Sequence, residues 1–230
     1  MTSTERHLEE MHKRVAAGTV PASASDPGLT ETRQRQIVEG ASKVLFANGF
    51  CKTSIRDIAA ACGMSMGQLY HYISSKDDIL YLMHLYSQEM WHQHLVDAGF
   101  ERISDPVAKF EHALHTTMRH LSENRELYRF IFTESKYLDK EHLRKVLELD
   151  NKNVVGFYRH LLSLIPGREI KGREAELAAN LVQHICMFMT LRGWNLDLKT
   201  TASKDAAAEF LVDFIFRGLG IERGAKSKEE

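Results

Sequence analysis

One stretch of the chain, CGMSMGQLYHYIS at residues 62–74, restricts the possible folds more than any other. Its Gly63 is a helix-stop signal, because glycine readily adopts the left-handed conformation that ends many helices. Ser65 and Gln68 then fit the S-x-x-Q capping box that begins a helix. The connection between these two helices is too short for anything but a tight turn, so the helices must cross steeply. The stretch therefore predicts a helix-turn-helix.

The flanking residues predict the helices that complete this arrangement. Thr30 is the expected N-cap of a first helix, which the sequence NGF at residues 48–50 ends. Thr53 is the expected N-cap of the second helix. Ser75 and Asp78 fit another capping box, which begins a long helix after the short third one. Three helices and a longer fourth are therefore expected at the start of the folded chain.

Apolar residues recur at helical spacing along nearly the whole chain, whereas the period-two alternation typical of strands is almost absent. Only 4 prolines and 14 glycines interrupt its 230 residues. After the long helix we expect about five or six more, with caps at Asp105, Asn124 and Asp139 and the last two over residues 173–192 and 203–219. The sequence predicts an all-α fold, with a three-helix helix-turn-helix domain followed by a larger helical domain.

Charge is distributed unevenly, although the net charge of the chain is only −1. Between residues 30 and 76, six lysines and arginines stand against three acidic residues, an excess of about +3. A local basic excess at a helix-turn-helix favours DNA as the partner.

Three features bear on location. The N-terminal sequence has no apolar signal segment, and no stretch approaches the length of a membrane span. The three cysteines include no C-x-x-C pair, which suits a reducing compartment. A cytoplasmic location and no membrane partner are therefore expected.

Side chains of the third helix and its surroundings are of the types that contact DNA. A helix-turn-helix places this helix in the major groove, where Gln68 can make the bidentate amide pairing that adenine accepts. Nearby hydroxyl, imidazole and ammonium groups can donate to phosphate oxygens, and Gly67 permits close approach of the backbone. The predicted residues that bind double-stranded operator DNA are Thr53, Ser65, Met66, Gly67, Gln68, Tyr70, His71 and Lys76.

The sequence TSIRDIAAACGMSMGQLYHYISSKDDIL, residues 53–80, resembles the DNA-binding domain of TetR-family transcriptional regulators. The shared pattern is a Thr-led helix, a Gly turn, a short recognition helix that ends in Tyr-x-x-Phe, and a Lys that opens a long helix. Cys62 and Ile73 depart from this pattern but keep apolar packing, whereas Met66 stands where a polar or basic residue is common. The resemblance implies a homodimeric repressor that a small ligand releases from a near-palindromic operator.

With this resemblance, the sequence predicts four segments. Residues 1–28 end in the linker-like sequence GTVPASASDPG and are expected to form a flexible arm. Residues 29–76 are expected to form the DNA-binding domain. Residues 77–221 are expected to bind the effector and form the dimer, and residues 222–230 to be a disordered tail.

The last two predicted helices are the expected dimer interface, because the resemblance implies a dimer of four packed helices. Small residues permit close packing between helices, and large apolar residues supply contact area. From periodicity alone, packing inside the chain's own core is an equal alternative. The predicted interface residues are Ala175, Ala178, Leu211, Phe214 and Ile215.

Two predicted helices carry polar residues among methionines and aromatic residues, a lining that suits an elongated, mostly apolar ligand with a polar end. The predicted ligand-binding residues are Met83, Tyr86, Met90, His184, Phe188 and Arg192. The alternative is ordinary core packing, with Arg192 complementing the C-terminus of its own helix. The resemblance implies a small-molecule effector, with acyl-CoA thioesters as one class and drugs or aromatic compounds as another.

Common sequence motifs of catalysis and of metal or cofactor binding are missing from the chain. It contains no H-E-x-x-H, G-x-S-x-G, P-loop or G-x-G-x-x-G sequence. We therefore expect no catalytic residues, no metal site and no cofactor. A helical enzyme and a helical interaction module that binds no DNA remain the alternative classes.

Overall fold

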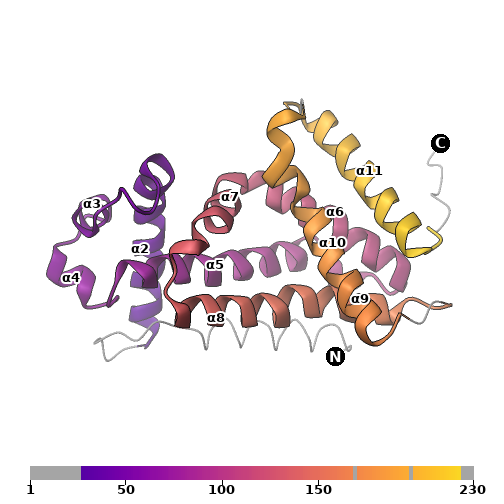
Figure 1. Cartoon of the computed structure of the whole chain (residues 1–230), viewed down its shortest axis with the longest axis horizontal. Coiled ribbons are helices and arrows are strands. Elements are labelled where there is room, and N and C mark those ends of the chain that lie inside the picture. The colour runs from indigo at the N-terminus through magenta and orange to yellow at the C-terminus, as the bar shows by residue number, and fades with distance from the viewer. Residues whose placement is uncertain (1–26, 168–169, 197–198, 224–230) are drawn as a thin grey trace. The chain divides into compact units, whose positions relative to one another are not determined.

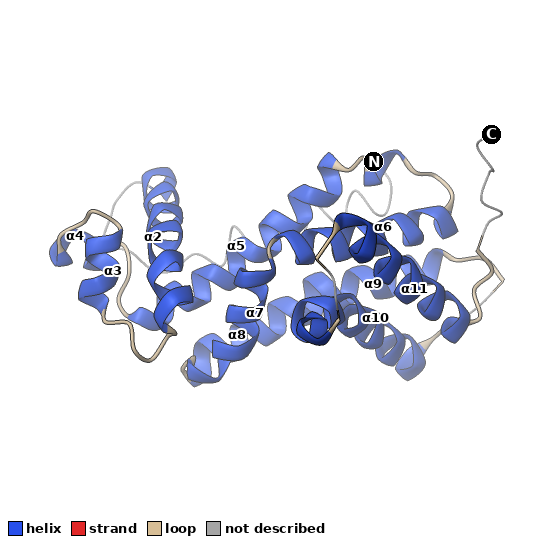
Figure 2. Cartoon of the chain, turned by 90° about the horizontal axis from the view of Figure 1, so that it is seen from above, coloured by secondary structure: helices blue, strands red, loops and turns tan. Residues whose placement is uncertain are grey.

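The structure is a computed structural model, and it describes residues 27–167, 170–196 and 199–223. Every regular element within these ranges is a helix (Figure 2), so the predicted fold class is confirmed. The helices follow one another along the chain from α2 in indigo to α11 in yellow (Figure 1). Among the described helices, none combines the length and the apolar character that crossing a membrane requires.

The bounds of these elements agree broadly with the predicted helices. The α-helices are α2 (Pro27–Asn48), α3 (Ile55–Ala61), α4 (Met66–Tyr70), α5 (Lys76–Asp97), α6 (Pro106–Glu123), α7 (Arg125–Glu134), α8 (Lys140–Asp150), α9 (Gly156–Leu164), α10 (Gly172–Arg192) and α11 (Thr201–Leu219). The short helical turns are η1 (Phe100–Arg102), η2 (Ser135–Tyr137), η3 (Asn151–Val155) and η4 (Gly193–Asn195).

The described residues form two compact units. The head unit comprises residues 27–90 and 125–150, and the body unit comprises residues 91–124 together with the described residues from 151 to 223. The boundary falls inside α5, which contributes its first part to the head unit and its last part to the body unit.

These units do not follow the domains predicted from the sequence. The head unit continues past residue 76 and also takes in residues 125–150. Because the units reflect packing and the predicted domains reflect function, the functional boundaries stay a prediction. All but the last two residues of the predicted arm lie outside the described residues, as do residues 224–230 of the predicted tail.

The helix-turn-helix in the head unit consists of α2, α3 and α4, whose apolar side chains share one core. Ile37 and Leu45 of α2, Ile58 of α3 and Leu69 of α4 are all fully buried. Burying side chains of this size contributes about 1.5–3 kcal/mol each, which offsets the entropy lost in ordering short helices.

Two glycines allow α2 and α3 to cross closely and the chain to turn. A Cβ atom on Gly40 would lie 2.7 Å from the sulfur of Cys62, so a side chain there would force the helices apart. Gly63 has a φ of +64°, the left-handed conformation that ends α3. The predicted tight turn before Ser65 is therefore confirmed.

Two predicted helix starts are wrong by a few residues. Helix α2 includes Pro27, so Thr30 lies inside the helix and is not its N-cap. Ser54, rather than Thr53, is the N-cap of α3. The reason is that the buried hydroxyl of Thr53 donates to the carbonyl of Gly49 at 2.8 Å, which leaves the next hydroxyl along the chain to cap the helix.

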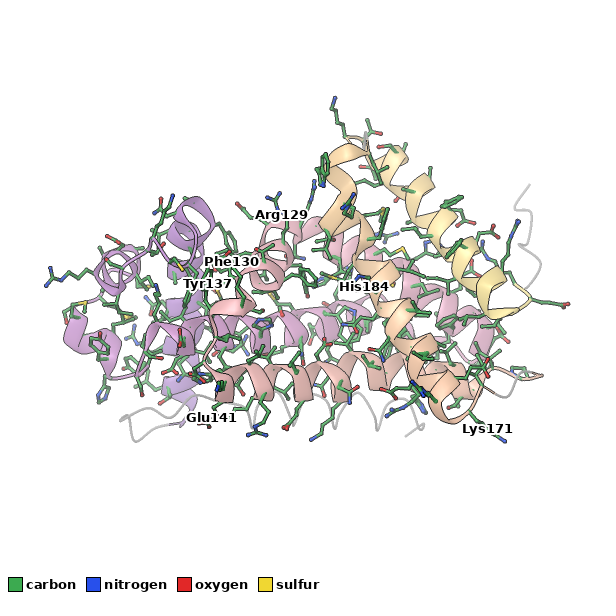
Figure 3. All side chains as sticks on the ribbon, in the orientation of Figure 1. Arg129, Phe130, Tyr137, Glu141, Lys171 and His184 are labelled. Atoms are coloured by element: carbon green, nitrogen blue, oxygen red, sulfur yellow. The ribbon has the colours of Figure 1, made fainter. Side chains whose placement is uncertain are left out.

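The segment from α7 to η2 packs against the helix-turn-helix within the head unit. The rings of Phe130 and Phe46 have centroids 5.2 Å apart, and Tyr137 stacks on Phe50 at 6.0 Å (Figure 3). The carboxylate of Glu134 accepts the backbone N–H of Phe50 at 3.0 Å. These contacts fix the end of α2 and the loop that follows it.

Apolar residues continue at helical spacing from Leu143 to Leu161, which predicts one long helix after Asp139, but the structure divides it. Helix α8 ends at Asp150, and the π-helical turn η3 separates it from α9. A π-helical turn closes i→i+5 hydrogen bonds in place of the α-helical i→i+4 pattern, and here it leaves Asn153 fully buried. The continuous apolar periodicity of the sequence does not reveal such a turn.

The core of the body unit lies among α6, α9 and α10 and contains a buried polar cluster. The hydroxyl oxygen of Thr117 accepts hydrogen bonds from the indole N–H of Trp91 and the hydroxyl of Tyr158, each at 2.9 Å. Because both donors are satisfied inside the core, we assign this cluster to packing.

The end of the described chain is held against the body unit. Helix α11 ends at Gly220, which has a φ of +61°. The guanidinium of Arg223 pairs with the carboxylates of Glu111 on α6 and Glu209 on α11. Residues 222 and 223 of the predicted tail therefore belong to the described part of the chain, and the predicted disorder stays a prediction.

Candidate nucleic-acid interface

The five residues of α4 present one side to the core and the other to solvent. Leu69 is fully buried, whereas Gln68, Tyr70 and His71 are exposed. The hydroxyl of Ser65 accepts the backbone N–H of Gln68 at 3.2 Å, as the predicted capping box requires. The structure thus brings the predicted base reader and two predicted phosphate-contacting residues onto one exposed surface, which we call the reading face (Gln68, Tyr70 and His71).

Two smaller residues adjoin the reading face. Gly67 is exposed, and a Cβ atom there would meet nothing within 4 Å, so the space beside it is open to a partner. Met66 is half-buried, whereas the sequence predicted an outward position. Its thioether carries no N–H or O–H donor, so it offers DNA an apolar contact instead of a phosphate bond.

The side chain of Gln68 also has a contact within the protein. Its amide oxygen accepts the backbone N–H of Ser65 at 2.8 Å. Bidentate pairing with adenine needs that same oxygen to accept the N6 amino group of the base. Because an amide oxygen has two lone pairs and can accept two hydrogen bonds, the predicted adenine pairing stays a prediction.

Lys76 and Thr53, two predicted phosphate contacts, have partners inside the head unit. The ammonium of Lys76 donates to the carbonyl oxygens of Phe50 at 2.7 Å and Thr53 at 3.1 Å. Thr53 is 1% exposed, and its hydroxyl is bonded to Gly49. Thr53 therefore has no surface to offer DNA, and Lys76 holds the loop between α2 and α3. A phosphate contact by Lys76 stays a prediction.

Asp78 caps α5 and also contacts His142 on α8. Its Oδ2 accepts the backbone N–H groups of Ser74 at 2.6 Å and Ser75 at 3.1 Å, as the predicted capping box implies. Its Oδ1 also lies 3.3 Å from Nε2 of His142 on α8, whose Nδ1 lies 2.6 Å from Asp139. His142 therefore joins α8 to the residues that follow the recognition helix. No local sequence signal predicts this contact, because its partners are far apart in the chain.

Residues 37–81, which contain the reading face, match the family model described as bacterial regulatory proteins of the tetR family. The chain belongs to the TetR family. Its helix-turn-helix is the DNA-binding domain of that family, so the resemblance stated from the sequence is confirmed. Membership of a family of transcriptional regulators also agrees with the prediction that the chain is not an enzyme.

One curated relative aligns with more than half of the chain. HbdR from Aromatoleum sp. (strain CIB), an HTH-type transcriptional regulator, is 30% identical over 142 residues. The alignment covers 60% of this chain and 58% of HbdR, so the chain spans less than two thirds of that relative.

Solved structures, among them the TetR-family regulator PfmR, share the fold over most of their length. PfmR from Thermus thermophilus is 27% identical, with a TM-score of 0.63 over 81% of this chain and 99% of PfmR. AibR, solved with isovaleryl coenzyme A and operator DNA, is 21% identical, with a TM-score of 0.63 over 80% of this chain and 98% of AibR. The likeness to AibR shows the fold alone. The TetR fold thus extends beyond the helix-turn-helix into the C-terminal helices.

Large apolar side chains are exposed on each of the last two helices, both in the body unit, and we call them together the exposed apolar surface. It comprises Leu177, Leu181 and Phe188 on α10 and Phe210 and Phe214 on α11. Leu181 is 62% exposed and Phe214 is 57% exposed, which is unusual for side chains of this size.

Only part of the predicted dimer interface lies on this surface. Phe214 belongs to it and Leu211 is half-buried, but Ala175, Ala178 and Ile215 are buried within the chain itself. The small residues Ala175 and Ala178 lie on the buried side of α10, a helix that packs mainly against α6 and α9. Both α10 and α11 carry apolar residues on two sides. The periodicity of the sequence does not tell which of the two sides faces the core.

The predicted ligand-binding residues divide between the two units. They are Met83, Tyr86 and Met90 on α5 and His184, Phe188 and Arg192 on α10. Met83 is fully buried, and the guanidinium of Arg35 lies 4.4 Å from the ring centroid of Tyr86. His184 and Arg192 are not buried on α10, where Figure 3 labels His184. A pocket shared by all six residues stays a prediction.

Proposed function

We propose that the chain is a dimeric transcriptional repressor that binds a near-palindromic operator through the reading face of α4. The observation that carries this proposal is the orientation of α4. Its capping box fixes the helix, Leu69 anchors it in the core, and Gln68, Tyr70 and His71 point outward. A helix-turn-helix with this orientation presents side chains to base edges and phosphates in the major groove.

The dimer is proposed to form through the exposed apolar surface of α10 and α11. A two-fold reader needs two recognition helices about 34–36 Å apart to occupy successive major grooves. Covering Leu181 and Phe214 in a symmetric interface would remove their apolar area from water and stabilise the dimer.

The proposed input is a small apolar ligand with a polar end, an acyl-CoA being the first candidate. AibR was solved with isovaleryl coenzyme A and operator DNA, which supports the candidate by analogy of fold. A sensor of drugs or aromatic compounds is the alternative. A cytoplasmic location follows from the proposed DNA target.

DNA binding is tested by selecting duplexes from a randomised library with the purified full-length chain. The proposal predicts that one near-palindromic sequence is enriched, and that it is bound at least about 1,000-fold more tightly than random duplex at fixed salt. Uniform recovery of all sequences would instead favour an interaction module that reads no DNA sequence.

The effector is tested by titrating short-chain and long-chain acyl-CoAs and apolar aromatic compounds into the protein with and without its selected operator. A true effector should lower operator affinity about 5- to 150-fold, and operator should lower effector affinity by the same factor. Free coenzyme A is the matched control, because it keeps the nucleotide but lacks the acyl group. Tight binding of a candidate without any change in operator affinity would rule that candidate out as the input.

A further inference from the structure

One imidazole in the head unit joins the carboxylates that cap two helices. Before α5, Oδ2 of Asp78 accepts the backbone N–H groups of Ser74 at 2.6 Å and Ser75 at 3.1 Å. At the start of α8, Oδ1 of Asp139 accepts the backbone N–H of His142 at 2.9 Å. The other oxygens of both carboxylates face the His142 ring, because Nε2 lies 3.3 Å from Oδ1 of Asp78 and Nδ1 lies 2.6 Å from Oδ2 of Asp139. His142 therefore connects the two caps directly.

Hydrogen bonds from the ring to both carboxylates need a charged imidazole. A neutral imidazole carries one N–H, and its second nitrogen presents a lone pair that can only accept. With a neutral ring, one of the two carboxylates would face this lone pair without a proton between them. The backbone N–H of His142 lowers the pKa of Asp139, so that carboxyl group supplies no proton of its own. An imidazolium donates to both carboxylates at once.

The other titratable groups around His142 come from the same two helices and their caps. They are Lys76, Asp77, Asp78 and Tyr81 on α5, and Asp139, Glu141 and Lys145 on or just before α8. Lys145 pairs with Glu141 at 2.6 Å, and the ammonium of Lys76 is bonded to the loop between α2 and α3. Burial and then the charge of Asp139 raise the pKa of Asp77, as expected for carboxylates that lie close together. An imidazolium at this place therefore meets negative charge from both helices.

We propose that His142, in its charged form, positions α4 for DNA by holding Asp78 and Asp139 together, so that operator affinity depends on one proton. The proposal rests on the DNA-binding function proposed above. Ser74 and Ser75 belong to the short connection between α4 and α5, and their N–H groups are bonded to Asp78. His142 lies on α8 and acts on the reading face through this connection, so it is a positioning residue.

The direction of the pH dependence follows from the number of bound protons. The arrangement with both contacts binds one proton more than the arrangement in which the ring is neutral and one contact is lost. Rising pH therefore favours the second arrangement. Histidine changes its charge between about pH 5 and pH 8, so operator affinity should fall from about pH 6 to about pH 8. We expect a decrease of about five-fold, which corresponds to ~1 kcal/mol for one lost hydrogen bond.

Two substitutions of His142 imitate the two charge states of the ring. His142→Gln offers one NH₂ group and one acceptor oxygen, much as a neutral imidazole offers one donor and one acceptor. His142→Arg offers donors at every pH. The purified full-length proteins are titrated with the selected operator by fluorescence anisotropy at one salt concentration, at about pH 6 and about pH 8.

The affinity of each variant is compared with that of the wild type at the same pH. His142→Gln should bind operator about five-fold more weakly than the wild type at the lower pH and equally well at the higher pH. His142→Arg should equal the wild type at the lower pH and bind about five-fold more tightly at the higher pH. His71 of the reading face is present in all three proteins, so its own titration does not affect these ratios.

Asp139→Asn is the matched variant that keeps the cap of α8. Its amide oxygen can accept the same backbone N–H groups, because asparagine caps helices as well as aspartate does. Its NH₂ group takes the place of Oδ2 and donates to Nδ1 of a neutral His142, whose Nε2–H then donates to Asp78. Because the neutral ring now makes both contacts, Asp139→Asn should bind operator about five-fold more tightly than the wild type at the higher pH.

Thermal melting at each pH separates positioning from stability. If His142→Gln melts earlier but binds operator as tightly as the wild type at the lower pH, His142 only stabilises the head unit, and the proposal is wrong. An equal pH dependence of operator affinity in the wild type and in Asp139→Asn would also overturn it. If the His142 variants do not fold, Asp139→Asn decides the question alone. Failure to select any operator would contradict the proposed function instead, so the two failures are distinguishable.

Discussion

The ammonium of Lys76 lies 2.7 Å from the carbonyl oxygen of Phe50 and 4.2 Å from the centre of the Phe50 ring. It also donates to the carbonyl oxygen of Thr53 at 3.1 Å. Lys76, the first residue of α5, therefore holds the loop between α2 and α3, although the recognition helix α4 lies between that loop and Lys76 in the chain. Lys76, which is expected to bind phosphate, therefore also stabilises this loop.

Replacing Lys76 by Met should lower the stability of the head unit by about 1–3 kcal/mol, because hydrogen bonds from a charged donor to two backbone carbonyls are lost. The decrease is measured by urea unfolding of the full chain. Lys43→Met is the matched control, since Lys43 is exposed on α2 and its loss should change stability by less than about 0.5 kcal/mol. If Lys76→Met keeps its stability but its DNA affinity depends less steeply on salt concentration, Lys76 contacts phosphate and does not stabilise the loop.

Two histidines, the buried His120 and the half-buried His84, should make the protein sensitive to mild acid. Burial lowers the pKa of both His84 and His120 to about 4, below the value near 6.5 of the unfolded chain. Between these values the unfolded chain binds more protons than the folded one. Stability should therefore be complete above about pH 7 and fall as the pH drops from about 6.5 towards 4, by at most about 1.4 kcal/mol per pH unit for each histidine.

The acid effect is measured as the melting temperature between pH 7.5 and pH 5. His84→Gln and His120→Gln should each show a shallower loss than the wild type, even if their stability at pH 7.5 is lower. If both variants lose stability as steeply as the wild type, other groups cause the acid sensitivity.

Phe214→Glu should convert the proposed dimer into a folded monomer. Because Phe214 is 57% exposed in the single chain, a carboxylate there stays hydrated in the monomer but loses water in an apolar interface. Sedimentation velocity gives the mass. Phe132→Glu, at a residue 54% exposed on α7 in the head unit, is the control and should remain dimeric. A Phe214→Glu protein that sediments as a dimer would place the interface elsewhere.

Arg223→Ala should lower the stability of the body unit by about 1–3 kcal/mol, because this partly buried guanidinium joins Glu111 of α6 to Glu209 of α11. Arg217 pairs with Asp213 at the surface, and its side chain is 81% exposed, so Arg217→Ala should have an effect below about 1 kcal/mol. Both are compared by urea unfolding. Equal effects of the two variants would mean that Arg223 is no more than a surface ion pair.

The sequence predicts the features that depend on neighbouring residues. The capping boxes of Ser65 with Gln68 and of Ser75 with Asp78 span three residues each and are seen in the structure. The left-handed turn at Gly63 is equally local, because it depends on the conformational freedom of that one residue. Local signals of this kind were sufficient to predict the helix-turn-helix and the outward direction of the reading face.

Features that depend on distant partners could not be predicted in this way. Lys76 is bonded to a carbonyl 26 residues earlier in the chain, and His142 meets Asp78 across two helices. The division of each apolar helix into a core side and an exposed side also depends on what packs against it, as Ala178 and Leu181 of α10 show. The π-helical turn between α8 and α9 leaves the apolar periodicity unbroken, so the pattern did not reveal it.

The central claim, that this chain reads DNA sequence through α4, is tested most directly by fluorescence-anisotropy titration at one salt concentration. Wild-type protein and Gln68→Ala are titrated with the selected operator, a scrambled duplex of the same composition, and operators changed at single positions. We expect the wild type to prefer the operator at least about 1,000-fold, and Gln68→Ala to lose about 5- to 150-fold of that preference at one position in each half-site. Equal affinity of the wild type for the operator and the scrambled duplex would contradict the claim.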